Sequence, residues 1–186
     1  MFNKSENFWN RHQERTSDAY FNNYIYPNRY VFVLTNLCNL RCEFCFQARK
    51  KRPDAMETKD WLDLISQIPE NSRITLTGGE PFVFKGFREV FNKKVENNYC
   101  NIISNGTLFK KETIEYVICK ENLKVLSVSI DEIYSKNRGV TDLQWQRMIE
   151  GIDYFHQEKK KRKTDISLDV KAVIMDENAH QLFDLN

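Results

Sequence analysis

Short apolar runs alternate along this chain with longer segments whose apolar residues recur at a helical period. Five runs have the length and composition of strands, at residues 30–35, 73–77, 101–104, 125–131 and 165–174. The first is continuously apolar, as in strands that are buried on both faces. The pattern therefore predicts a sheet whose strands are separated by other elements.

The segments between these runs place their apolar residues on one helical stripe. Helices are predicted at residues 57–69, 86–97, 110–120 and 141 to about 157, and another begins at 177. Thr141 and Gln144 have the spacing of a capping box at the start of the longest helix. Residues 1–29 are rich in aromatic residues without a clean period, and we interpret them as an N-terminal cap or extension, with a substrate-recognition segment as the alternative.

The connections between the predicted strands are too long for hairpins, so parallel strands with crossover helices follow. This predicts an α/β fold with one core domain over residues 30–186. An open doubly wound sheet and a full or partial barrel both fit the alternation. Several loops with candidate chemistry follow successive strands, and a barrel brings such loops to one point, which favours a partial barrel.

Composition changes this picture little. Of the 186 residues, 41% are hydrophobic and 29% are charged, which is typical of a globular domain, and a net charge of +2 predicts neither nucleic acid nor a membrane as partner. The N-terminal residues lack the apolar core of a signal peptide, so a cytoplasmic location is expected. Five cysteines, three of them clustered, fit metal ligation better than a disulfide framework.

The clustered cysteines follow the first predicted strand at Cys38, Cys42 and Cys45, with C-x3-C-x2-C spacing. Neighbouring thiolates repel one another unless a metal or cluster neutralises them. Three thiolates complete neither a tetrahedral zinc site nor a four-thiolate cluster. Either a fourth protein ligand comes from elsewhere, or one metal position stays open to a ligand that is not protein. Cys100 and Cys119 are predicted at the far end of the sheet, which disfavours them as the fourth ligand.

Further motifs follow the later strands. They are Gly78-Gly79-Glu80-Pro81, Asn105-Gly106 and Ser129 to Asp131. Together with the cysteines and Phe44, they resemble the radical S-adenosylmethionine (radical SAM) superfamily over about residues 30–183. The resemblance implies a partial (βα)6 barrel, of which about five βα units are present. It also implies a [4Fe-4S] cluster on the three cysteines, with its fourth iron chelated by S-adenosylmethionine. The cofactor contacts that it implies are Phe44, Gly78, Gly79, Glu80, Asn105, Ser129 and Asp131.

Several of these positions also have a physical argument. Paired glycines let backbone approach a ligand closely, and Glu80 supplies negative charge where a cation would bind. Because side chains alternate along a strand, Ser127, Ser129 and Asp131 share one face, which predicts a polar-lined interior rather than a filled barrel. A half-exposed edge strand is the alternative interpretation.

The resemblance implies reductive cleavage of S-adenosylmethionine to a 5′-deoxyadenosyl radical that abstracts hydrogen from a small-molecule or peptide substrate. An external one-electron reductant would be required. The motifs look most like the branch that contains peptide-modifying maturases and molybdenum-cofactor synthases. A basic run at residues 49–52 could attract an acidic substrate or leader segment.

Two rival functions stay open. One is a zinc- or cluster-binding module without catalysis, and the other is a degenerate family member that recognises a partner peptide. Because the family barrel has six strands and this chain stops after the fifth, the resemblance also implies a C-terminally truncated chain, whose activity alone is not assured.

Overall fold

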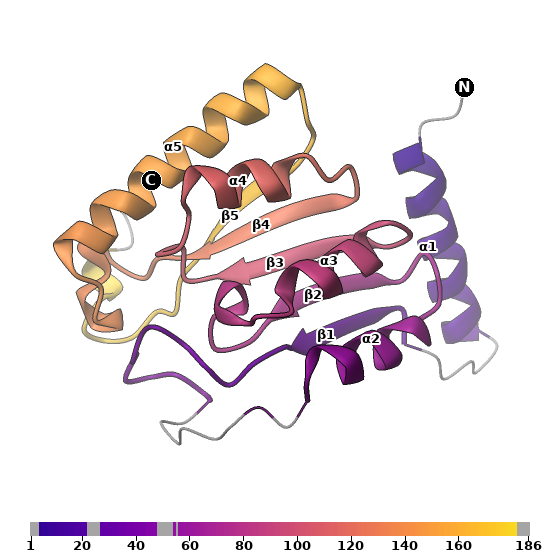
Figure 1. Ribbon diagram of the computed structural model, residues 1–186, viewed down its shortest axis with the longest axis horizontal. Coiled ribbons are helices and arrows are strands. Elements are labelled where there is room, and N and C mark those ends of the chain that lie inside the picture. The colour runs from indigo at the N-terminus through magenta and orange to yellow at the C-terminus, as the bar shows by residue number, and fades with distance from the viewer. Residues whose placement is uncertain (1–3, 22–26, 48–53, 55, 182–186) are drawn as a thin grey trace.

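One parallel sheet organises the molecule (Figure 1). The computed structural model describes residues 4–21, 27–47, 54 and 56–181. The five strands are β1 (Arg29–Val33), β2 (Arg73–Thr77), β3 (Tyr99–Ser104), β4 (Leu123–Ser129) and β5 (Ser167–Lys171). Each strand pairs in parallel with the next one in the chain. A doubly wound sheet reverses its strand order at a switch point, whereas this order never reverses, as in a barrel. The predicted partial barrel is confirmed.

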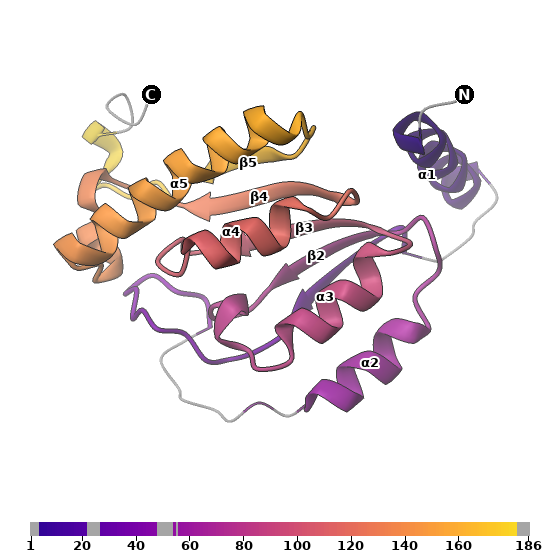
Figure 2. The same ribbon diagram turned by 45° about the horizontal axis from the view of Figure 1, so that its top comes forward.

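The helices match most of the predicted stripes. They are α1 (Lys4–Phe21), α2 (Thr58–Ser66), α3 (Phe87–Val95), α4 (Lys111–Ile118) and α5 (Asp142–Arg162), with short 3-10 turns η1 (Pro81–Val83) and η2 (Ile133–Arg138). The predicted capping box forms at the start of α5, where Thr141 accepts from the backbone of Gln144. In Figure 2, α2 to α5 lie along one face of the sheet, while α1 stands apart.

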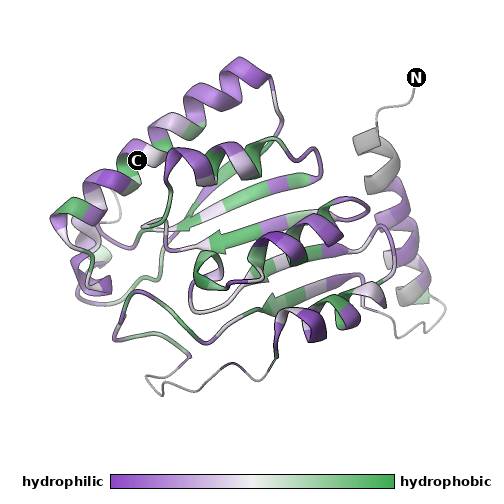
Figure 3. Cartoon of the chain, in the orientation of Figure 1, coloured by the Kyte–Doolittle hydropathy of each residue, from purple (hydrophilic) through white to green (hydrophobic). Residues whose placement is uncertain are grey.

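The core lies between that face of the sheet and α2 to α5. Phe32, Leu76, Ile102 and Leu126 occupy adjacent register positions on four strands, and each is at most 7% exposed. Each large apolar side chain buried in this way stabilises the fold by about 2 kcal/mol. The strands are accordingly mostly hydrophobic in Figure 3, whereas the helices carry both kinds of residue.

The opposite face of the sheet has polar residues on β4 and β5 and is exposed mainly along its edge strands. Val31 and Val33 on the edge strand β1 are 53% and 40% exposed. Ser127 of β4 lies beside Asp169 of β5 on this face, and Ser129 lies beside Lys171. The alternation predicted for the fourth strand is therefore confirmed, and polar residues line the concave side of the partial barrel.

The terminal segments differ from the sequence-based expectations. Helix α1 forms where no period was evident, and it contacts the domain at the end opposite the strand arrowheads (Figure 1). There Arg15 Nη1 donates to the carbonyl of Glu70 at 3.0 Å, and Asn28 donates to Thr16 Oγ1 at 3.0 Å. The α-helix predicted from residue 177 is wrong for the described residues, because beyond Met175 they form turns and a short 3-10 segment. Residues 182–185 of that prediction and the basic run at 49–52 lie outside the described residues. Of the helices in the described part of the chain, none is long and apolar enough to cross a bilayer.

Candidate cofactor site

The loops that follow β1 and β2 pack backbone against backbone at the carboxyl edge of the sheet. Gly79 N donates to the carbonyl of Thr35 at 2.7 Å, and Glu80 N donates to the carbonyl of Leu37 at 2.9 Å. A Cβ atom at Gly79 would lie 2.2 Å from the Leu37 oxygen, and one at Gly78 would lie 2.9 Å from the Thr35 oxygen. In this structure, therefore, the backbone at the start of the cysteine loop occupies the space that the missing glycine side chains leave.

Glu80 anchors the next contact, between β2 and β3. Its carboxylate is fully buried and accepts from Ser104 Oγ at 2.9 Å, from Asn105 N at 2.8 Å and from Phe82 N at 3.2 Å. Burial raises the pKa of Glu80 to about 7, against the opposing effect of these three hydrogen bonds. Glu80 thus places a titratable group inside the site, and its oxygens bond to protein donors.

Asn105 extends this network to the cysteine loop. Its Nδ2 donates to Asn39 Oδ1 at 2.9 Å and lies 3.7 Å from Cys38 Sγ, and its Oδ1 accepts from Thr107 N at 3.0 Å. Gly106 follows with φ of 78°, a conformation that favours glycine and that turns the chain back toward α4. The predicted Asn-Gly turn therefore positions the first cysteine. Asn39 and Thr107 had no sequence signal of their own.

The three thiols lie at the surface of this network. Cys38 and Cys45 are exposed and Cys42 is half-buried. Desolvation raises the pKa of Cys38 and of Cys42. The pKa of Cys38 is raised further by the charges of Glu80 and Cys45, and that of Cys42 by the charges of Cys38 and Cys45. The thiols are thus close enough to interact, and deprotonating all three requires a compensating positive charge.

The donor set fits an iron–sulfur cluster better than a single ion. In the part of the chain that the structure describes, no three His, Cys, Asp or Glu side chains converge closely enough to hold one metal ion. The ligands of a [4Fe-4S] cluster each bind a different iron, so they surround the cluster instead of converging on a point. Three accessible thiols on one loop can meet that requirement, each with a different iron.

Asp131 lies just beyond β4 and is fully buried. Arg138 forms an ion pair with it, with Nε 2.5 Å from Oδ2 and Nη2 2.8 Å from Oδ1, and Val173 N donates to Oδ1 at 2.7 Å. The carboxylate is therefore surrounded by protein donors, and its predicted direct contact with a cofactor stays a prediction. Ser129, at the end of β4, is half-buried on the concave face.

Sequence reasoning missed Arg138. It is 8% exposed, its guanidinium lies 5.1 Å from the centre of the Phe44 ring, and its Nη1 is 3.9 Å from Cys42 Sγ. Arg138 and Cys42 are 96 residues apart in the sequence, so no local pattern relates them. The structure thus adds a cation to the predicted site residues and places it beside the cysteine loop.

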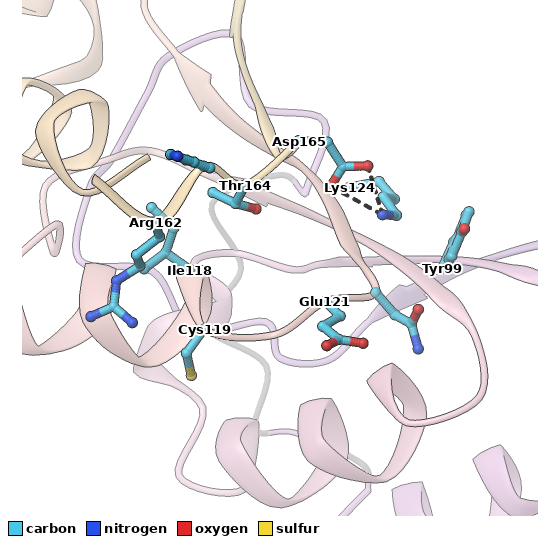
Figure 4. Close-up of a pocket in the computed structure, with 10 residues that line it drawn as sticks. Tyr99, Ile118, Cys119, Glu121, Lys124, Arg162, Thr164 and Asp165 are labelled. Carbon is cyan, nitrogen blue, oxygen red and sulfur yellow. Dashed lines mark hydrogen bonds and ion pairs between the residues drawn. The ribbon is translucent and has the colours of Figure 1, made fainter. Parts of the chain in front are cut away.

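The remaining cysteines lie at the other end of the sheet, as predicted. Cys100 is fully buried at the start of the β3 core, where burial strongly raises the pKa of its thiol. Cys119 lines an open pocket of about 590 Å³ with Lys124, Arg162 and Asp165 (Figure 4). Lys124 in this pocket pairs with Asp165 at 2.9 Å, and Arg162 pairs with Glu158 at 2.7 Å. This pocket offers paired surface charges and one thiol, far from the cysteine loop.

Comparisons with known proteins agree with this geometry. A family model described as the radical SAM superfamily matches residues 32–178. The sporulation killing factor maturation protein SkfB of Bacillus subtilis (strain 168) is 34% identical over 110 residues, which are 56% of this chain and 26% of SkfB. The antilisterial bacteriocin subtilosin biosynthesis protein AlbA of the same strain is 28% identical over 137 residues, which are 68% of this chain and 29% of AlbA.

A solved structure shows the same fold. The crystal structure of Streptococcus suis SuiB bound to S-adenosylmethionine superposes with a TM-score of 0.72 at 23% identity, over 93% of this chain and 40% of SuiB. This chain therefore spans between about a quarter and two fifths of the length of these three proteins. What it shares with SuiB is the fold.

Proposed function

The chain belongs to the radical SAM superfamily, and we propose that it binds a [4Fe-4S] cluster and S-adenosylmethionine and uses them in an enzymatic reaction on a peptide. The observation that carries this proposal is the cysteine loop at the carboxyl edge. Its three thiols interact electrostatically and remain accessible at the surface of the loop. In this proposal, three thiolates leave one coordination position of the cluster for a ligand that is not protein.

In this proposal, Cys38, Cys42 and Cys45 hold the cluster. When bound, the cluster and S-adenosylmethionine supply a 5′-deoxyadenosyl radical that abstracts hydrogen from the substrate, with the electron coming from an external reductant. The chain contributes binding and orientation. The residues proposed to contact the cofactor are Phe44, Gly78, Gly79, Glu80, Asn105, Ser129 and Asp131.

From their contacts and burial we infer two roles for these residues. Phe44 and Ser129 present side chains that are only half-buried, so they are available to a ligand. Glu80, Asn105 and Asp131 bond mainly to other protein groups, and we infer that they hold the loops in place. Gly79 lets the cysteine loop reach its position against β2.

A peptide is the substrate class that the relatives favour. SkfB is named as a maturation protein, and SuiB has also been solved bound to the precursor peptide SuiA. On the concave face, Asp169 is partly exposed and Lys171 is exposed, so the polar edge at β5 offers a surface on which an extended substrate can lie. We assign residues 30–186 to the core domain and residues 1–29 to an extension at the end opposite the site, where α1 contacts Glu70.

Anaerobic reconstitution followed by metal analysis tests the proposal. We expect about four irons and four sulfides per chain, and an electron paramagnetic resonance spectrum of the reduced cluster that changes when S-adenosylmethionine is added. One zinc per chain without iron would instead identify a structural metal module. A cluster that does not respond to S-adenosylmethionine would identify a protein without this chemistry.

Substrate class needs a separate measurement. The chain is supplied with a reductant, S-adenosylmethionine and either a pool of short peptides or a pool of small metabolites. We expect release of 5′-deoxyadenosine to rise only with the peptides. Stimulation by the metabolite pool alone would assign a small-molecule substrate and leave the cluster assignment intact.

A further inference from the structure

Arg138 reaches the cysteine loop from a segment that the predicted motifs do not include. Its guanidinium lies over the Phe44 ring, and its carbonyl oxygen is within 3.9 Å of Cys42 Sγ, as is its Nη1. An arginine over an aromatic ring is attracted to the ring face, and a cation beside sulfur stabilises negative charge there. Arg138 thus contacts the cysteine loop through an aromatic ring and through a proposed cluster ligand.

The position of Arg138 is fixed from behind by Asp131. The carboxylate is fully buried, the arginine is 8% exposed, and the two groups are joined by a two-point ion pair. Burying two charges costs several kcal/mol in desolvation, and a hydrophobic pair of similar volume often serves stability equally well. The buried ion pair is therefore not explained by its contribution to stability. It is explained if the site requires a positive charge at a fixed position.

The backbone between these two residues is also held in an unusual conformation. Tyr134 and Ser135 have φ of 65° and 47°, in the left-handed region that non-glycine residues seldom adopt. Asn137 N donates to Glu132 Oε1 at 2.6 Å and Val140 N donates to the carbonyl of Ser135, which hold the segment closed. Such strain persists only where surrounding contacts enforce it. The strained turn brings Arg138 back against Asp131 and toward the cysteine loop.

We propose that Arg138, oriented by Asp131, is a positioning residue that fixes the cysteine loop and sets the reduction potential of the cluster. This inference rests on the proposed cluster at Cys38, Cys42 and Cys45. Reduction adds negative charge to the cluster, and a fixed cation beside one of its ligands favours the reduced form. Removing the cation lowers the potential, so the cluster becomes harder to reduce.

A pair of double variants tests the charge. Asp131→Asn with Arg138→Gln removes both buried charges and leaves a shorter polar side chain in place of the guanidinium. Lys136→Gln with Asp142→Asn removes an exposed ion pair joined to the same segment, which makes it a matched control. After anaerobic reconstitution, the midpoint potential is measured by titration monitored with electron paramagnetic resonance. We expect a shift to more negative potential in the first variant, none in the control, and a value near that of the unmodified chain for Arg138→Lys.

Three outcomes are separable. If the unmodified chain takes up no iron–sulfur cluster, the proposed function itself fails. If the chain loads a cluster but the Asp131 and Arg138 variant has the unmodified potential, only the role of Arg138 is overturned. Equal shifts in the test variant and in the control would also overturn it, because a general change in surface charge would then explain the result.

Phe44→Leu tests the same contact if the buried double variant does not fold. This change leaves the ion pair intact and removes only the ring beneath the guanidinium. We expect the cluster to be lost about tenfold faster during gel filtration, as for other residues that support metal ligands. Phe46→Leu is the matched control, since Phe46 is in the same loop and 83% exposed. Equal cluster retention in both variants would contradict the positioning role.

Discussion

Polar side chains form different contacts at the two edges of the sheet, namely the amino edge, where the strands begin, and the carboxyl edge, where they end. At the amino edge, buried polar side chains bond to loop carbonyls, as where Lys94 Nζ donates to Ile68 O at 3.1 Å and Asn98 donates to Pro69 O at 3.0 Å. The ion pair of Lys124 with Asp165 at this edge is partly exposed, with 63% of the Asp165 side chain accessible. These contacts connect loops to one another through groups that are already bonded within the protein.

At the carboxyl edge, buried charges bond to side chains and loops from distant parts of the chain. Glu80 joins β2 to β3, and Asp131 holds Arg138 against the loop that follows β1. Three thiols are gathered there, and strained residues follow β4. The difference shows that charge and cysteine content alone do not mark a site, because both edges have them. The carboxyl edge differs because four successive loops bring together buried ionisable side chains and accessible cysteine thiols.

The largest expected effect contrasts cysteines at the two edges. Cys42→Ala removes one of three proposed cluster ligands, so iron content after reconstitution should fall to near background, and reductive cleavage of S-adenosylmethionine should stop. Cys119→Ala removes an exposed thiol at the opposite edge and should leave both unchanged. Iron and sulfide analysis with quantification of 5′-deoxyadenosine checks both. A Cys42→Ala variant that still cleaves S-adenosylmethionine would defeat the ligand assignment.

A glycine substitution tests how tightly the loops pack. In Gly79→Ala, the new Cβ would lie 2.2 Å from the backbone oxygen of Leu37, which cannot move without displacing Cys38. We expect the free energy of unfolding to fall by about 4 kcal/mol, beyond the usual cost of overpacking. Gly139→Ala, with no atom near its Cβ but φ of 73°, should cost about 1 kcal/mol. Urea denaturation of the two variants measures the difference, and equal losses would show that the loops have room to adjust.

The third prediction concerns pH. Because burial raises the pKa of Glu80 from 4.5 to about 7, the folded chain binds this proton more tightly than the unfolded chain does. The stabilisation is complete below about pH 4.5, is lost as the pH rises toward 7, and totals about 3 kcal/mol. Glu80→Gln should remove this pH dependence, because glutamine does not titrate. It should also lower the free energy of unfolding by an amount that does not vary with pH, because the new amide N–H₂ group faces the Asn105 N–H. Urea titrations of the metal-free chain across this interval test it, and parallel curves for the two proteins would contradict it.

The smallest effect is expected at the amino edge. Asp165→Asn breaks the ion pair with Lys124, but the exposed carboxylate is already well hydrated. We expect the free energy of unfolding to change by less than about 1 kcal/mol, with no change in iron content. A larger loss, measured by urea denaturation, would show that the amino edge also depends on fixed charges.

The sequence determined the architecture because its signals are local. Residues 73–77 have exactly the bounds of β2, and the capping box at Thr141 forms as its spacing predicts. Alternation along β4 correctly placed Ser127 and Ser129 on the concave face. The sequence missed α1, whose described side chains are mostly exposed and give no periodic apolar stripe.

Only the tertiary structure decided how the site is assembled. Sequence motifs identified Glu80 and Asp131, but not that both are buried and bonded to other protein groups. They identified Gly79, but not that the Leu37 backbone fills the space that it leaves. Arg138 was not identified at all, because its partners Phe44 and Cys42 lie more than 90 residues away along the chain. Such contacts depend on how parallel strands bring their carboxyl ends together, which no local spacing encodes.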